Sequence, residues 1–104
     1  MSNYCVTFRI AKKAVEGKSY SDRYDQLADG IHDGSAGYWS EPTSFILVGS
    51  NLDTESFAKK AIKGLSREED MLFVFDPEDM SACYFGAIEH EEVLKSFFPR
   101  AKKL

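Results

Sequence analysis

Long hydrophobic segments are missing from this chain of 104 residues, in which the longest apolar runs, at 45–48 and 71–75, hold only four or five residues. A helix that crosses a membrane needs about 20 predominantly apolar residues. The start of the chain also lacks the basic residues and the apolar stretch of a secretory leader. We therefore expect a cytoplasmic protein with no membrane partner.

Residues that build the common metal and nucleophile sites are scarce. The two cysteines, Cys5 and Cys83, are too few for a disulfide scaffold and have no zinc-ligand spacing. Both lie in apolar segments, where we expect buried thiols. Neither His32 nor His90 has a Cys or Ser neighbour that would form an activated nucleophile, and His32 is interpreted as a surface group near a helix end. A glycine-rich phosphate loop and a Ser-His-Asp order are missing too.

An excess of positive charge is also absent, because 17 acidic residues outnumber 13 basic ones and the net charge is −4. A protein that binds phosphates over a broad face usually has the opposite balance, so non-specific nucleic-acid binding is disfavoured. The acidic excess lies between residues 66 and 79. Two small basic groups are Lys59, Lys60 and Lys63, and Arg100, Lys102 and Lys103. We interpret both as solvated surface, with phosphate contacts as the alternative.

Regular spacing of apolar residues is what the sequence does contain. Residues 4–10 alternate with a period of two, which predicts a first strand. After a charged connection, an apolar stripe at helical spacing predicts a helix over 20–31 that begins at a serine cap. Two short apolar runs separated by a proline predict a hairpin with strands at 37–40 and 43–49.

The second half of the chain continues this alternation of elements. Apolar spacing predicts a second helix around 57–65, and the continuous apolar run at 71–75 predicts a strand covered on both faces. Residues 81–88 predict one more strand, and 93–98 predict a short helix. We expect the tail at 100–104 to be mobile.

These elements predict a single α+β domain over 1–104, with a core at about 4–88 and a C-terminal helix and tail at 89–104. The order strand, helix, strand, strand, helix, strand is that of the ferredoxin-like βαββαβ sandwich, here with an extra C-terminal strand and short helix. In that topology the first strand pairs with the third and fourth, and the second is an edge. The extra strand extends its own sheet or crosses to a second subunit, and we favour a homodimer.

The sheet face away from the helices is expected to be too apolar to stay exposed to water. We assign to it Cys5, Thr7, Ser44, Ile46, Val48, Leu72 and Val74, or their opposites where a register differs. Tyr38 and Trp39, on a short edge strand, are candidate interface residues, with core packing against the first helix as the alternative.

Four pieces of the sequence together resemble one known family. They are Val-Thr-Phe at 6–8, Tyr-Ser-Asp-Arg-Tyr at 20–24, the aromatic pair followed by Ser-Glu-Pro-Thr-Ser-Phe-Ile-Leu-Val at 40–48, and Arg-Glu-Glu-Asp-Met-Leu-Phe-Val-Phe-Asp at 67–76. In their order and spacing, over about residues 4–88, they resemble CRISPR-associated protein 2 and its stand-alone relatives. The resemblance implies a small ferredoxin-like homodimer, which in that family is proposed as a metal-dependent nuclease or acts as a non-catalytic DNA-holding bridge.

The resemblance also implies a divalent cation held by one carboxylate from the end of the first strand of each subunit. This chain has Arg9 at that position, and a guanidinium cannot ligate Mg²⁺ and would repel it. We therefore expect no metal cofactor. The antiparallel arrangement brings Asp70 near the same strand end, where we expect it to pair with Arg9 at a candidate interface.

Mg²⁺ or Mn²⁺ belongs only to a nuclease alternative, in which Asp76 and Asp79 are the catalytic candidates and Glu78 is a third metal ligand. The composition of this acidic segment is more typical of a turn.

Acidity and Arg9 favour a small dimeric, non-enzymatic interaction or regulatory protein that resembles a degenerate member of the family. One alternative is a divalent-metal-dependent endonuclease acting on RNA or DNA, with phosphate contacts from Lys59, Lys60 and Lys63. Another is an acidic inhibitor that binds a nucleic-acid-binding protein by mimicking phosphate charge through residues 68–79. The identity of a partner or substrate stays open.

Overall fold

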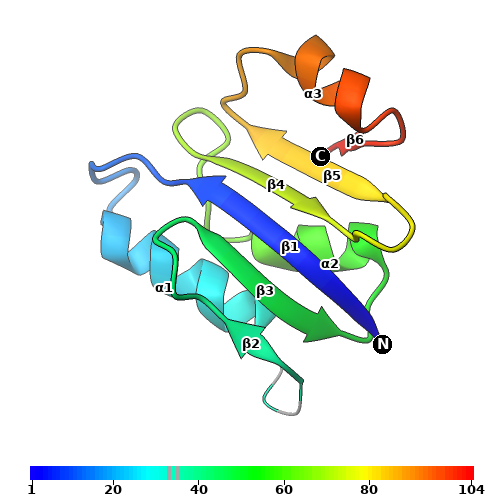
Figure 1. Ribbon diagram of the computed structural model, residues 1–104. Helices are drawn as coiled ribbons and strands as arrows, with labels where there is room; N and C mark the ends of the chain where they lie inside the picture. Colours follow the sequence, from blue (N-terminus) through cyan, green and yellow to red (C-terminus); the bar gives the residue numbers. More distant parts are fainter. Residues whose placement is uncertain (33, 35) are drawn as a thin grey trace.

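The computed structural model describes residues 1–32, 34 and 36–104, which form a mixed α+β structure (Figure 1). The elements in chain order are β1 (Ser2–Arg9), α1 (Tyr20–Ile31), β2 (Tyr38–Trp39), β3 (Phe45–Ser50), α2 (Thr54–Ala61), β4 (Met71–Phe75), β5 (Ala82–Gly86), α3 (Glu91–Phe97) and β6 (Lys102–Lys103). The strands of these residues form one six-stranded sheet in the order β2-β3-β1-β4-β5-β6.

The pairing of β1 organises the sheet. It runs antiparallel to β3, with Tyr4 opposite Val48, and antiparallel to β4, with Val6 opposite Val74. These are the two neighbours expected for the first strand, and β2 is an edge as expected. β5 pairs antiparallel with β4 in the same chain, so the extra strand extends its own sheet.

Local sequence explains where the first two elements begin and end. In β1, Tyr4, Val6 and Phe8 are buried while the residues between them are exposed or half-buried, as the period of two predicts. The serine cap of α1 is Ser19, whose hydroxyl accepts a hydrogen bond from the backbone of Asp22, while the Asp22 carboxylate accepts one from the Ser19 backbone. The helix therefore begins at Tyr20 as predicted.

Helices cover both faces of the sheet, but unequally. α1 and α2 lie behind the sheet in Figure 1, and the main core fills the space between them and the strands. Leu27 of α1 and Phe57 of α2 are fully buried there. On the opposite face, Leu94 and Phe98 from α3 and its end pack against Phe73 of β4. β4 is thus covered on both sides, as its continuous apolar run predicts.

The predicted assignment of residues to the two sheet faces is only partly correct. Cys5 and Thr7 lie on the face away from α1 and α2, as predicted, but Ile46, Val48 and Leu72 are buried against the helices. Val74 is buried there too, and Ser44 precedes β3. The error has a physical cause, because an uninterrupted apolar run carries no alternation that fixes which residue faces which side. The opposite residues of these strands, Phe45, Leu47, Phe73 and Phe75, occupy the other face.

The expectation of a mobile C-terminal tail is wrong. Lys102 and Lys103 form β6, which runs parallel to β5, and Ala101 is buried. The Leu104 backbone N–H donates to the carbonyl of Tyr84 at 2.9 Å, and Arg67 donates to the Leu104 carbonyl at 2.6 Å. Ion pairs reinforce the strand, since Lys102 contacts Glu55 and Lys103 contacts Glu91, each at 2.9 Å. Such pairing to distant residues leaves no local sequence pattern.

Candidate protein-interaction surface

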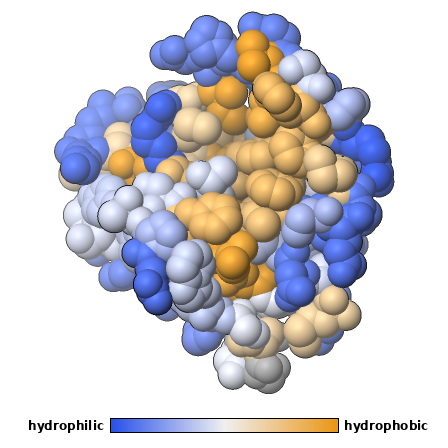
Figure 2. All heavy atoms as spheres, viewed as in Figure 1, coloured by the Kyte–Doolittle hydropathy of each residue, from blue (hydrophilic) through white to orange (hydrophobic). Residues whose placement is uncertain are grey.

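An apolar surface remains on the sheet face that α1 and α2 do not cover. Leu94 of α3 and the following Phe98 pack against this face at β4 and β5, while α3 itself lies toward the β5 edge of the sheet in Figure 1. The part above β1, β2 and β3 is left uncovered. Figure 2 looks onto this face and shows hydrophobic residues gathered across the middle of the molecule. We call this surface the open face and define it by Cys5, Thr7, Trp39, Phe45 and Leu47. Phe75 of β4 lies at its border, where its ring is 5.0 Å from that of Phe98. Trp39 and Leu47 are 42% and 40% exposed, which is unusual for large apolar side chains lying side by side on a sheet.

The open face is hollowed at one end. A shallow depression of about 450 Å³ lies along β1 and the β2–β3 edge, with Cys5, Trp39, Leu47 and Pro77 among the residues that line it. At its wall, the Trp39 indole N–H donates to the Glu41 carboxylate at 3.2 Å. Burial and the nearby Asp76 charge raise the pKa of the Cys5 thiol, so it stays neutral near pH 7. The depression therefore presents uncharged, mainly apolar side chains to a partner.

The two predicted interface aromatics point to opposite sides of β2. Tyr38 is half-buried against the main core, and its ring lies 4.7 Å from that of His32. Trp39 pairs with Leu47 and belongs to the open face. Alternation along a strand therefore splits the pair into one packing residue and one surface residue.

Arg9 and Asp70, which we expected to pair, do not contact each other. Arg9 is an exposed residue at the end of β1, and its guanidinium donates to the Ala87 carbonyl at 3.3 Å. Asp70 is fully buried and forms an ion pair with Arg23 of α1 at 2.9 Å. The expected Arg9–Asp70 pair is therefore wrong. Arg23 takes that role because it lies on the inward stripe of α1, four residues before the fully buried Leu27.

A closed hydrogen-bond network surrounds this buried pair. Arg23 also donates to the carbonyls of Ala11, Lys13 and Lys18, and so holds the connection between β1 and α1. The Asp70 carboxylate also accepts hydrogen bonds from the backbone N–H groups of Ala11 and Ser66. Burial raises the pKa of Asp70, but the hydrogen bonds from Arg23, Ser66 and Ala11 outweigh it and hold the pKa below its usual value. The network is structural and lies away from the open face.

The acidic candidates for metal binding form the turn between β4 and β5. Asp76 accepts a hydrogen bond from the Glu78 backbone at 2.9 Å, and Asp79 accepts two from Ser81, at 2.8 and 2.6 Å. Met80 adopts a positive φ of 62° within this turn. Among the residues that the structure describes, no group of three or more His, Cys, Asp or Glu side chains is arranged to hold a metal ion. In this arrangement the carboxylates serve the turn, as its composition indicates.

Most basic candidates for phosphate contacts also have partners in the chain. Lys59 pairs with Glu55 at 3.0 Å, one turn earlier in α2, while Lys60 and Lys63 are exposed nearby. In the second group, Lys102 and Lys103 hold β6 and Arg100 donates to the Asp79 carbonyl at 2.7 Å.

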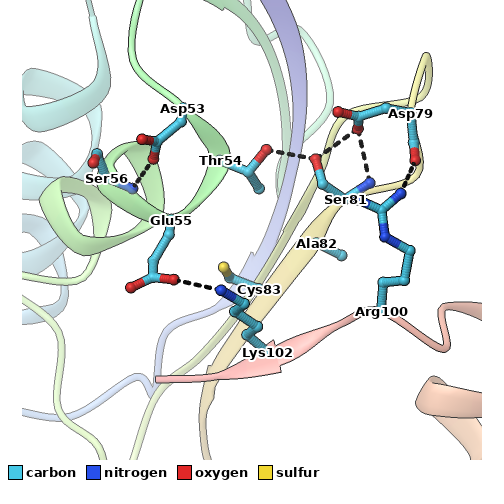
Figure 3. Close-up of a pocket in the computed structure, with 10 residues that line it drawn as sticks. All are labelled: Asp53, Thr54, Glu55, Ser56, Asp79, Ser81, Ala82, Cys83, Arg100 and Lys102. Carbon is cyan, nitrogen blue, oxygen red and sulfur yellow. Dashed lines mark hydrogen bonds and ion pairs between the residues drawn. The ribbon is translucent and has the colours of Figure 1, made fainter.

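A larger depression of about 740 Å³ lies between the start of α2, β5 and β6 (Figure 3). Its charged groups have partners within the chain: Asp53 accepts a hydrogen bond from the Ser56 backbone at 2.8 Å, and Glu55 pairs with Lys102. The Cys83 thiol lies beside this pair, is buried as expected, and has its pKa raised first of all by that burial. A protonated thiol is a weak nucleophile, so the depression has no activated attacking group among these residues.

No protein-family model, curated protein or solved structure matches this chain significantly. Among the described residues, none of the helices has the length and apolar character needed to cross a membrane. The function of the chain is therefore inferred from the geometry of the open face and of the depressions described above.

Proposed function

We propose that this protein is a small, non-enzymatic interaction module that binds proteins through the open face, beginning with a second copy of itself. The strand order β2-β3-β1-β4, with α1 and α2 on one side, supports a ferredoxin-like arrangement to which β5, α3 and β6 are added. The observation that carries the proposal is the open face, where Trp39 and Leu47 remain about two-fifths exposed on an otherwise apolar surface. Burying such a surface against a partner releases its ordered water and is favourable.

The charge at the end of β1 supports a non-enzymatic role. Arg9 is held there by its hydrogen bond to the Ala87 carbonyl. If the chain is a degenerate relative of CRISPR-associated protein 2, as the sequence resemblance implies, this cation stands where the family has a metal-binding carboxylate. A guanidinium at that point disfavours Mg²⁺ in each subunit of a dimer.

The placement of the acidic segment favours the same proposal over an acidic inhibitor. Asp70 and Asp76 are buried, and Glu69 pairs with Lys13 at 3.0 Å. These carboxylates are not presented together as a row of phosphate-like charges. A protein that mimics a nucleic acid needs such charges to face its partner.

We expect the protein to leave labelled single-stranded and double-stranded RNA and DNA intact in the presence of Mg²⁺ or Mn²⁺. The reason is that Asp76 and Asp79 are occupied as hydrogen-bond acceptors within their turn. Cleavage products with metal should equal those in EDTA, and Asp76→Ala should give the same result as the unaltered chain. Cleavage that needs metal and disappears in Asp76→Ala would instead support the nuclease alternative.

A further inference from the structure

α3 carries more apolar surface than its own chain covers. Leu94 and the following Phe98 pack against β4 and β5, which half-buries them. On the adjacent side of the same short helix, Val93 and Phe97 are 51% and 71% exposed. These two residues are four apart and so lie on one stripe of the helix. The exposed stripe therefore has the character of a contact surface.

The open face has room for one more helix beside α3. Adjacent strands lie about 4.8 Å apart and a helix with its side chains is about 10 Å wide, so one helix covers about two strands. Leu94 and Phe98 cover the part of the face at β4 and β5, which leaves β1 and β3 for a second helix. In Figure 2, apolar residues extend from the region of α3 across to these strands.

Charges border the two surfaces in a complementary way. The exposed stripe of α3 begins beside Glu89 and Glu92, both exposed to solvent. Arg9 borders the open face. It follows Cys5 and Thr7 at every second position of β1, so the three residues lie on the same side of the sheet. Opposite charges at the rim of an apolar contact orient the partners and favour the correct pairing.

We propose that the open face of each chain receives α3 of a second copy, with Val93 and Phe97 seated against Leu47 and Trp39. This proposal rests on the proposed function and specifies its first partner. Each copy contributes both a helix stripe and an open face. A two-fold axis between the copies therefore forms the same helix-to-sheet contact twice. A stable interface buries roughly 800 Å² per partner, more than one short helix supplies, so the dimer needs both reciprocal helix contacts and the sheet faces between them.

Sedimentation velocity with two single variants tests this arrangement. Phe97→Glu and Leu47→Lys each place a charge in the contact and should each weaken the dimer by about 100-fold or more in Kd. Phe97 is largely exposed in the monomer, so the Phe97→Glu variant should keep the far-ultraviolet circular dichroism and melting temperature of the unaltered monomer. Lys95→Glu is the matched control, because residue 95 lies on the side of α3 opposite to the stripe and should leave the dimer unchanged.

An equimolar mixture of the two variants tests directly whether residues 97 and 47 meet across the dimer. In one contact of the mixed dimer, the carboxylate introduced by Phe97→Glu meets the ammonium group introduced by Leu47→Lys, and the other contact is unaltered. Mixing should therefore restore dimers that neither variant forms alone. A dimer lost in Leu47→Lys but retained in Phe97→Glu would overturn the α3 contact and leave the proposed function intact. A chain that stays monomeric up to millimolar concentration would overturn both the α3 contact and self-association.

Discussion

Arg23→Ala and Asp70→Ala should each lower the free energy of unfolding by about 3–5 kcal/mol, because each leaves its partner as an unpaired buried charge. Arg23 and Asp70 are 1% and 0% exposed, and their network joins the β1–α1 connection to the segment before β4. Urea denaturation followed by circular dichroism measures this loss as a lower midpoint with an unchanged slope.

Lys59→Ala provides the control for this effect. It removes an ion pair with Glu55 that is exposed to solvent, where screening leaves little net stabilisation. Its urea midpoint should stay close to that of the unaltered protein. If Arg23→Ala shifted the midpoint no further than Lys59→Ala does, the buried network would not hold the fold together as described.

The same pair predicts a specific acid sensitivity. The folded-state pKa of Asp70 is depressed, so its contribution to stability is complete above the unfolded value of about 3.9 and is lost as the pH falls through the folded pKa. The Asp70→Asn variant has no ionisable group at this position, so its stability lacks this pH dependence. The difference in unfolding free energy between the unaltered protein and Asp70→Asn should therefore shrink as the pH is lowered from 6 toward 3. A difference independent of pH would show that folding does not lower the Asp70 pKa, and a difference that grows as the pH falls would show that Asp70 is not ionised in the fold.

Leu47→Glu should weaken self-association at least about 100-fold in Kd, since a symmetric dimer would bury two carboxylates against apolar side chains. Leu47 is 40% exposed in the single chain, so the substitution costs the monomer little. Sedimentation equilibrium over a range of concentrations measures the change as a shift from twice the 11.7 kDa chain mass to the chain mass itself.

Leu52→Glu is the matched control for the open face. Leu52 has a similar exposure of 37%, but it borders a different depression, near Gly30 and Lys60 on the helix side. It should leave the association unchanged. Equal loss of dimer in Leu47→Glu and Leu52→Glu would show that added charge, and not the open face, governs association.

Local patterns in the sequence predict much of this fold. The alternation in β1 and the serine cap of α1 work because the forces that create them act between residues near one another in the chain. Local sequence patterns do not predict features that depend on partners far away in the chain. β6 pairs with β5 and Lys102 reaches Glu55, contacts that no property of residues 100–104 alone predicts.

The candidate surface is predicted in part for the same reason. Trp39 can be recognised from the sequence as an aromatic residue on a short edge strand, and it lies on the open face. Leu47 cannot, because it lies within a continuous apolar run whose register comes from pairing with β1. The buried Arg23 carries a local hint in its place on the apolar stripe of α1, but its partner Asp70 is 47 residues away.

The most direct test of the open face as the contact surface is the concentration dependence of backbone amide chemical shifts, from low micromolar to millimolar protein. We expect the amides of Cys5, Thr7, Trp39 and Leu47 to shift as dimers form, while those of Lys60 and Lys63 on the helix side do not. Shifts confined to α1 and α2, or no shifts at any concentration, would contradict it.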